Sequence, residues 1–102
     1  MLIALDGPAK QYQLNVSSSV VKEVVETTTV FDDRKVVTLL PIDGKIWIFL
    51  GDGVNTPTVS DVKTKGFPGF KNAFVSFEAG VYQPIWIVAD TSTVDVRIAE
   101  RG

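Results

Sequence analysis

The stretch that decides the fold is IWIFLGDG, Ile46–Gly53, which has an echo in IWIVADTS, Ile85–Ser92. In both, an Ile-Trp-Ile core runs into a small residue followed by an Asp, and the chain's only two tryptophans stand in these cores. Each segment is apolar at successive positions and ends where turn residues release the chain, which predicts two central β-strands that are apolar on both faces. The echo is therefore architectural, and Asp52 and Asp90 are predicted turn formers rather than a duplicated catalytic pair.

The rest of the chain also favours strands. Valine, isoleucine and threonine dominate, and such β-branched residues pack well on a pleated sheet but lose rotamer freedom in a helix. Turn signals recur between the apolar segments, among them Asp43-Gly44, which we interpret as a hairpin turn. The sequence predicts an all-β fold, an antiparallel β-sandwich or jelly-roll-like barrel of about seven or eight short strands. Period-two alternation places Tyr12, Leu14 and Val16 on one face of a strand near the start, and it turns Val94, Val96 and Ile98 inward near the end.

One segment has the spacing of a helix face, with the triple serine before it available as a cap: Val20, Val21, Val24 and Val25. The threonine run that follows has low helix propensity. We therefore expect a strand here, with room for a bulge, and a helix is the alternative.

The two Ile-Trp-Ile strands leave one apolar face to be covered. A two-layer sandwich buries one face of each sheet, and alternation does not say whether the isoleucines or the tryptophans point inward. Exposing Trp47, Phe49 and Trp86 would cost about 1.5–3 kcal/mol for each large apolar side chain. We expect another subunit to cover this face, in preference to the N-terminal arm or a long loop.

The chain is expected to form one domain, a β-sandwich over residues 10–102, preceded by an arm over residues 1–9. The arm is apolar up to Asp6-Gly7-Pro8, a turn that would let it lie across a neighbouring subunit. An ordinary first strand is the alternative for this segment. The N-terminus lacks a basic region and a signal-length apolar run, so no cleavable signal peptide is predicted.

Composition removes most catalytic chemistry. Cysteine and histidine are absent, which excludes disulfides, thiolate metal sites, a cysteine nucleophile, the Ser-His-Asp triad and the HExxH zinc site. A carboxylate pair such as Glu78 and Asp90 remains, but nothing in the spacing selects it. The oxygen-rich segment Asp52–Asp61 lacks EF-hand spacing, and we interpret it as a turn followed by a short loop. The sequence predicts a protein that is not an enzyme and holds no metal or cofactor.

Charge and hydropathy also limit the partners. The net charge is −2, and basic residues are interleaved with acidic ones, so no basic stripe is available to neutralise phosphates. No apolar run approaches the roughly 18 residues that span a bilayer. Neither nucleic acid nor a membrane is an expected partner. The loop KGFPGFKN, by contrast, displays Phe67 and Phe70 among glycines and lysines, either as plugs for the end of the sandwich or as an aromatic hook for a partner or a sugar ring.

The features from Lys35 to Gly102 follow a recognisable order. The strand KIWIFLGDG is followed by a polar loop with Ser60-Asp61, a Pro-Gly-Phe turn ending at Phe70, an aromatic strand through Phe77 and a final STVDVRIAE. This order resembles a family of small virion proteins of tailed bacteriophages, encoded beside the major capsid protein and described as capsid decoration or head proteins.

The resemblance implies a jelly-roll β-sandwich without enzymatic activity, which cements the capsid exterior as an oligomer. Its partners would be the major capsid protein and copies of itself, and it would be made in the host cytoplasm and reside on the virion. The predicted partner surface comprises Met1, Leu2, Ile3, Leu5, Trp47, Phe67, Phe70 and Trp86. The alternative function is a carbohydrate-binding or a fibre or tail adhesion module, in which the tryptophans or these phenylalanines stack on sugar rings.

Overall fold

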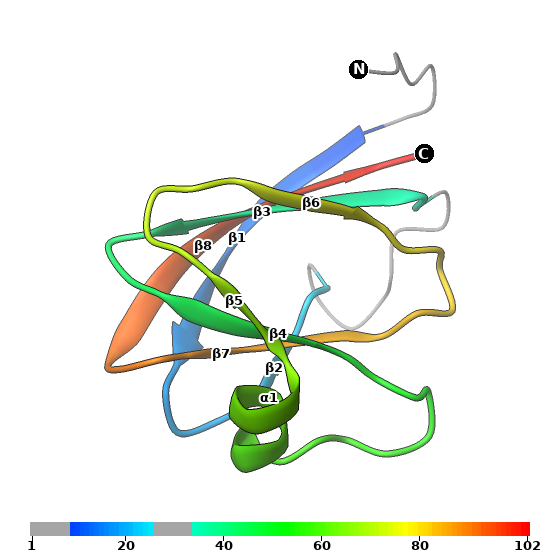
Figure 1. Ribbon diagram of the computed structural model, residues 1–102. Helices are drawn as coiled ribbons and strands as arrows, with labels where there is room; N and C mark the ends of the chain where they lie inside the picture. Colours follow the sequence, from blue (N-terminus) through cyan, green and yellow to red (C-terminus); the bar gives the residue numbers. More distant parts are fainter. Residues whose placement is uncertain (1–8, 26–33) are drawn as a thin grey trace.

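The computed structural model describes residues 9–25 and 34–102, which form two sheets packed face to face (Figure 1). The first sheet contains β1 (Ala9–Ser17), β3 (Val36–Ile42), β6 (Val75–Glu78) and β8 (Thr93–Arg101). The second contains β2 (Lys22–Glu23), β4 (Ile46–Leu50), β5 (Phe67–Gly69) and β7 (Ile85–Ala89). A short helix, α1 (Val59–Lys65), lies in the connection from β4 to β5.

The strand order is that of a jelly roll. The sheets read β1-β8-β3-β6 and β2-β7-β4-β5, and every pairing is antiparallel. The pairs β1–β8, β2–β7, β3–β6 and β4–β5 make one long antiparallel ribbon that folds back at the connection carrying α1. The further pairs β3–β8 and β4–β7 roll this ribbon into two layers, the double Greek key of the jelly roll. The predicted all-β antiparallel sandwich is confirmed.

The core lies between the two sheets and is built from alternate positions of the strands. The inward residues expected on the last strand are in place, with Val94, Val96 and Ile98 all buried. On the first strand the shared face also points inward: Leu14 and Val16 are buried, and Tyr12 packs against the core. The isoleucines of both Ile-Trp-Ile cores are fully buried in the same cluster: Ile46, Ile48, Ile85 and Ile87. The isoleucines therefore face inward, and Trp47 and Trp86 are half-buried on the outer face of the second sheet.

Helix α1 covers part of that outer face (Figure 1). Its Val62 is fully buried, as is Val88, which faces outward on β7 beside Trp47. At this position the apolar outer face is thus covered by the long connection between β4 and β5, which was the alternative, and not by another subunit, which we had expected. The helix itself was not predicted, because the segment Asp52–Asp61 was interpreted as a turn and a loop.

A capping box starts this helix. Thr58 Oγ1 accepts a hydrogen bond from the Asp61 backbone N–H at 3.1 Å, and the Asp61 carboxylate accepts one from the Thr58 N–H at 3.2 Å. The hydrogen bond that the Thr58 backbone N–H donates to the carboxylate is the main cause that holds the pKa of Asp61 below its ordinary value. The T-x-x-D spacing was a readable helix-start signal in the sequence, and we missed it.

The end of α1 lies so close to β4 that it tolerates only glycine. A Cβ atom at Gly66 would lie 2.4 Å from the carbonyl oxygens of both Ile48 and Val62. Both are backbone atoms that cannot rotate away, so we expect Gly66→Ala to lower the free energy of unfolding by about 1–3 kcal/mol. Gly80→Ala is the matched control, because a Cβ atom there meets nothing within 4 Å. Urea denaturation compares them, and equal stability of the two variants would contradict this packing of α1.

Three local predictions need correction or comment. Asp43-Gly44 does not close a hairpin, because β3 and β4 belong to different sheets; it forms a corner, with Asp43 at φ 63°. Gly44 is needed there because a Cβ atom would lie 2.5 Å from Val94 Cγ2. The segment 20–25 contains the short strand β2 and no helix, as preferred. Ala9, which was assigned to the N-terminal arm, begins β1, and residues 1–8 lie outside the described part of the chain.

Candidate functional site

Two of the predicted partner residues, Trp47 and Phe70, meet around one ammonium group. Nζ of Lys45 lies 4.4 Å from the ring centroid of Trp47 and 5.6 Å from that of Phe70. Indole Nε1 of Trp47 donates a hydrogen bond to Oδ1 of Asp90 at 2.8 Å, and Nζ of Lys63 on α1 donates to the Asp90 carbonyl at 3.2 Å. The Trp47 ring is thereby fixed, while Phe70 is 58% exposed. We call these three side chains the Trp47–Lys45–Phe70 cluster.

The other predicted aromatics lie elsewhere. The ring of Phe67 packs edge to face on Phe77, with centroids 5.9 Å apart, and so bridges the edge strands β5 and β6 of the two sheets. Trp86 pairs opposite Phe49 and packs against Gly51, where a Cβ atom would lie 2.9 Å from the indole Nε1. Phe67 thus has the packed position expected of a plug, although it is still 37% exposed, and Phe70 has the more exposed position expected of a hook. Met1, Leu2, Ile3 and Leu5 lie outside the described residues.

A groove of about 440 Å³ crosses the outer face of the first sheet. Its position follows from the register, which places Ala99 of β8 between Gln11 of β1 and Thr38 of β3. The next row contains Gln13, Arg97 and Leu40. Because Ala99 has only a methyl side chain between longer neighbours, it forms the floor of the groove.

Phe74 completes the wall of this groove, immediately before the first residue of β6. The last pair of the β3–β6 ladder is Leu39 with Val75, so Phe74 comes next, beside Leu40. Its side chain is 74% exposed. Covering a side chain of this size would contribute about 1.5–3 kcal/mol.

The charges beside the groove are paired with each other. Nη2 of Arg97 lies 3.0 Å from Oδ2 of Asp95, and Nε of Arg97 donates to both carboxylate oxygens. The guanidinium holds the pKa of Asp95 below its ordinary value by hydrogen bonding, and the carboxylate raises that of Arg97. The pair therefore stays ionised and contributes no net charge. Next to it, Gln13 Nε2 donates to Asn15 Oδ1 at 2.6 Å.

Sequence reasoning missed this groove, although a signal was present. The outward positions of β1 are polar amides, namely Gln11, Gln13 and Asn15, and they alternate with the inward residues that we did identify. The small residue Ala99 can be recognised as the floor of a groove only when the register of β1, β8 and β3, which are far apart in the sequence, is known.

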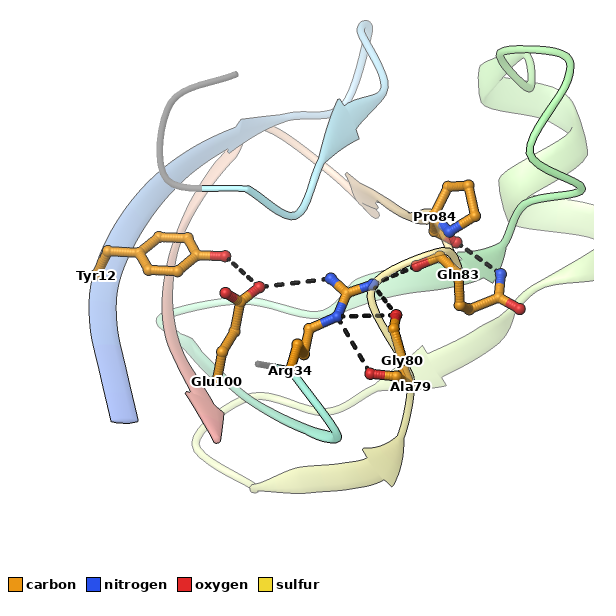
Figure 2. A network of polar contacts seen from close by, with 7 residues as sticks. All are labelled: Tyr12, Arg34, Ala79, Gly80, Gln83, Pro84 and Glu100. Atoms are coloured by element: carbon orange, nitrogen blue, oxygen red, sulfur yellow. Dashed lines mark hydrogen bonds and ion pairs between the residues drawn. The ribbon is translucent and has the colours of Figure 1, made fainter. Parts of the chain in front are cut away.

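A buried charge pair anchors the open end of the sandwich (Figure 2). Nη1 of Arg34 lies 3.5 Å from Oε1 of Glu100, and the two residues are 2% and 1% exposed. Tyr12 donates its hydroxyl proton to the same carboxylate oxygen at 2.9 Å. Arg34 also donates to the carbonyl oxygens of Ala79 at 3.2 Å and Gly80 at 2.7 Å, and to that of Gln83. This network ties β8 and β1 to the connection between β6 and β7, and its burial makes it a structural clamp rather than a place for substrate.

The candidate carboxylate pair is not assembled. Glu78 pairs with Val36 on the outer face of the first sheet, whereas Asp90 is bonded to Trp47 on the outer face of the second. The two layers of the sandwich separate them. Within residues 9–25 and 34–102, no three metal-ligating side chains gather into a group, and no helix is long and apolar enough to cross a membrane.

Comparisons with known proteins return no match: no protein-family model, no curated protein and no solved structure is significantly similar to the chain. The resemblance to capsid decoration proteins therefore remains a prediction that rests on the order of strands and loops.

Proposed function

We propose that this chain is a non-enzymatic structural protein of a tailed-bacteriophage virion, which binds the outer capsid surface as an oligomer. Its partners in this proposal are the major capsid protein and copies of itself. The observation that carries the proposal is the Trp47–Lys45–Phe70 cluster. Aromatic residues are enriched at the centres of protein interfaces, where a few large side chains contribute most of the binding energy.

The geometry of the cluster suits a contact with another protein. Trp47 is held by Asp90, so it loses little side-chain freedom on binding, and Phe70 projects from the turn after β5. The ammonium of Lys45 already lies against both rings, so a partner surface that covers Phe70 buries a preformed cation–π contact. An anchor that is already ordered pays a smaller entropic penalty on binding.

The jelly roll supports the proposal by analogy alone. Viral capsid domains and lectins are both built on this fold. Because one fold hosts many functions, the assignment to a capsid depends on the surface cluster and on the resemblance, and the fold adds only a prior.

The test is co-sedimentation with capsids assembled from the major capsid protein of the same phage. The wild-type protein should sediment with assembled capsids. Phe70→Ala should bind about thirtyfold more weakly, the loss expected for an interface anchor. Tyr82→Ala is the matched control, because Tyr82 is an aromatic residue that is 94% exposed on the connection between β6 and β7, and we expect it to bind as the wild type does.

Failure of the wild-type protein to bind capsids would contradict the proposal. Equal binding by the Phe70→Ala variant would show that the cluster is not the contact. Sedimentation velocity of the free protein measures its oligomeric state in solution. If the protein were a monomer in solution and also bound capsids as a monomer, the proposed oligomer would be contradicted.

A further inference from the structure

The groove on the first sheet has a chemistry of its own, separate from the Trp47–Lys45–Phe70 cluster. It combines an exposed aromatic ring, Phe74, with two side-chain amides and a guanidinium above a small floor residue. Binding sites for small molecules are concave, with apolar walls and a few polar groups that fix orientation. The groove has both elements on one rigid sheet face.

We propose that this groove binds a saccharide, with Phe74 stacked on the C–H face of a sugar ring and Gln11, Gln13 and Arg97 bonded to its hydroxyl groups. A pyranose ring presents an apolar face and an edge of hydroxyls, each of which is both donor and acceptor. A glutamine amide matches this edge, because it carries two donors and an acceptor. Within residues 9–25 and 34–102, the side-chain amide of Gln11 has no hydrogen-bond partner, so it is open to a ligand.

The local charge favours a sugar over a nucleic acid. Affinity for a phosphate backbone comes from basic side chains that replace its counterions. The guanidinium of Arg97 is instead neutralised by Asp95 through three contacts of 3.0–3.3 Å. The groove is therefore close to neutral, polar and aromatic, which suits an uncharged hydroxylated ligand.

The position on a sheet face argues against a peptide strand. An extended peptide adds to the edge of a sheet, where unpaired backbone groups receive it. The floor residue Ala99 lies on β8, which is flanked on both sides by β1 and β3, so its backbone groups face partners within the sheet. A ligand in the groove meets side chains only.

The floor provides a direct test. Ala99→Leu would extend a branched side chain into the groove while leaving the core unchanged, because Ala99 points outward. Thr93→Leu is the matched control, since Thr93 lies on the same strand and the same face but pairs with Ser17, outside the groove. Phe74→Ala removes the aromatic wall in a second, independent way.

The experiment is an NMR titration of the ¹⁵N-labelled full-length chain with cellopentaose, maltopentaose, xylopentaose, mannopentaose and chitopentaose. At least one should shift the backbone signal of Ala99 and the side-chain amide signals of Gln11 and Gln13. Ala99→Leu should abolish these shifts, and Phe74→Ala should weaken binding about tenfold. Thr93→Leu should bind as the wild type does, and the spectra also show that each variant is folded.

Absence of shifts at the groove with every one of these saccharides would overturn the proposal, as would binding that survives Ala99→Leu. The outcome is independent of the capsid proposal. Phe70→Ala should impair capsid binding and leave the saccharide titration unchanged, whereas Ala99→Leu should do the reverse. If Ala99→Leu instead impaired capsid binding or changed the oligomer mass, the groove would be a protein contact and the saccharide proposal would fail.

Discussion

Glu100→Gln should lower the free energy of unfolding by about 3–5 kcal/mol, because it leaves the guanidinium of Arg34 buried without its counter-charge. Both residues are almost inaccessible to water, so the solvent cannot replace the lost carboxylate charge. A chain of this length has a total stability of about 5–15 kcal/mol, and the variant would lose a large part of it. Urea denaturation followed by tryptophan fluorescence measures the loss, as a lower midpoint at an unchanged slope.

An exposed carboxylate provides the control for this prediction. Glu78 lies exposed on β6, and Glu78→Gln should change stability by no more than about 0.5 kcal/mol. If Glu100→Gln cost no more than Glu78→Gln, the buried pair would not be stabilising the end of the sandwich that it anchors.

The double variant Arg34→Met with Glu100→Leu separates the charge from the other contacts. Removing both charges together should cost less than the sum of the single changes, because no isolated charge remains buried. It should still be less stable than the wild type, because the carbonyl oxygens of Ala79, Gly80 and Gln83 lose the guanidinium as a donor. A double variant as damaged as the sum would show that the two side chains act independently.

The strands were predictable because the alternation of apolar and polar residues can be recognised within a single short segment. In β8, Val94, Val96 and Ile98 are buried while the residues between them are exposed or half-buried, and a single strand is enough to show this period. The Ile-Trp-Ile strands were harder, since both of their faces are apolar. Their orientation depended on which face α1 would cover, and the start of α1 is encoded by four residues from Thr58 to Asp61 among several poor helix formers.

The pairing of strands was not predictable from local patterns. Asp43-Gly44 has the residues of a tight turn, but whether the chain returns beside itself or crosses to the other sheet depends on the packing of Val94, which lies far along the sequence. The groove has the same origin, because Ala99 is a floor only between Gln11 and Thr38. The loop sequence pointed to Phe67 and Phe70 together without separating their roles, whereas Phe74 gained its place from the β3–β6 ladder, whose end pair, Leu39 with Val75, lies next to it.

Arg34 and Glu100 illustrate a further limit. In the sequence, Glu100 continues the inward positions of the last strand, where an apolar residue is expected. A charge at such a position signals either the end of the buried stretch or a buried partner. The partner comes from a distant segment, so the sequence alone does not identify it.

Ile48→Ala should lower the free energy of unfolding by about 2–5 kcal/mol, the range for truncating a large aliphatic side chain in a closed core. Ile48 is fully buried and pairs directly with Ile87, so each of the two Ile-Trp-Ile segments contributes one of these neighbours. Ile87→Ala should cost a similar amount, and the double variant should differ from the sum because the two cavities merge. Urea denaturation measures all three variants.

Leu50→Ala tests whether this loss of stability comes from burial in the core or from truncating any large side chain on β4. Leu50 lies on the same strand β4 but is 44% exposed, so its truncation should cost about 1 kcal/mol or less. Leu50 shares the face of Ile48 but lies at the exposed end of the strand, so an equal loss for Leu50→Ala and Ile48→Ala would mean that burial in the core does not set the cost. The expected difference would instead explain the repeated tripeptide: its isoleucines hold the two layers of the jelly roll together, and its tryptophans are left for the outer surface, where only one of them, Trp47, contributes to the Trp47–Lys45–Phe70 cluster.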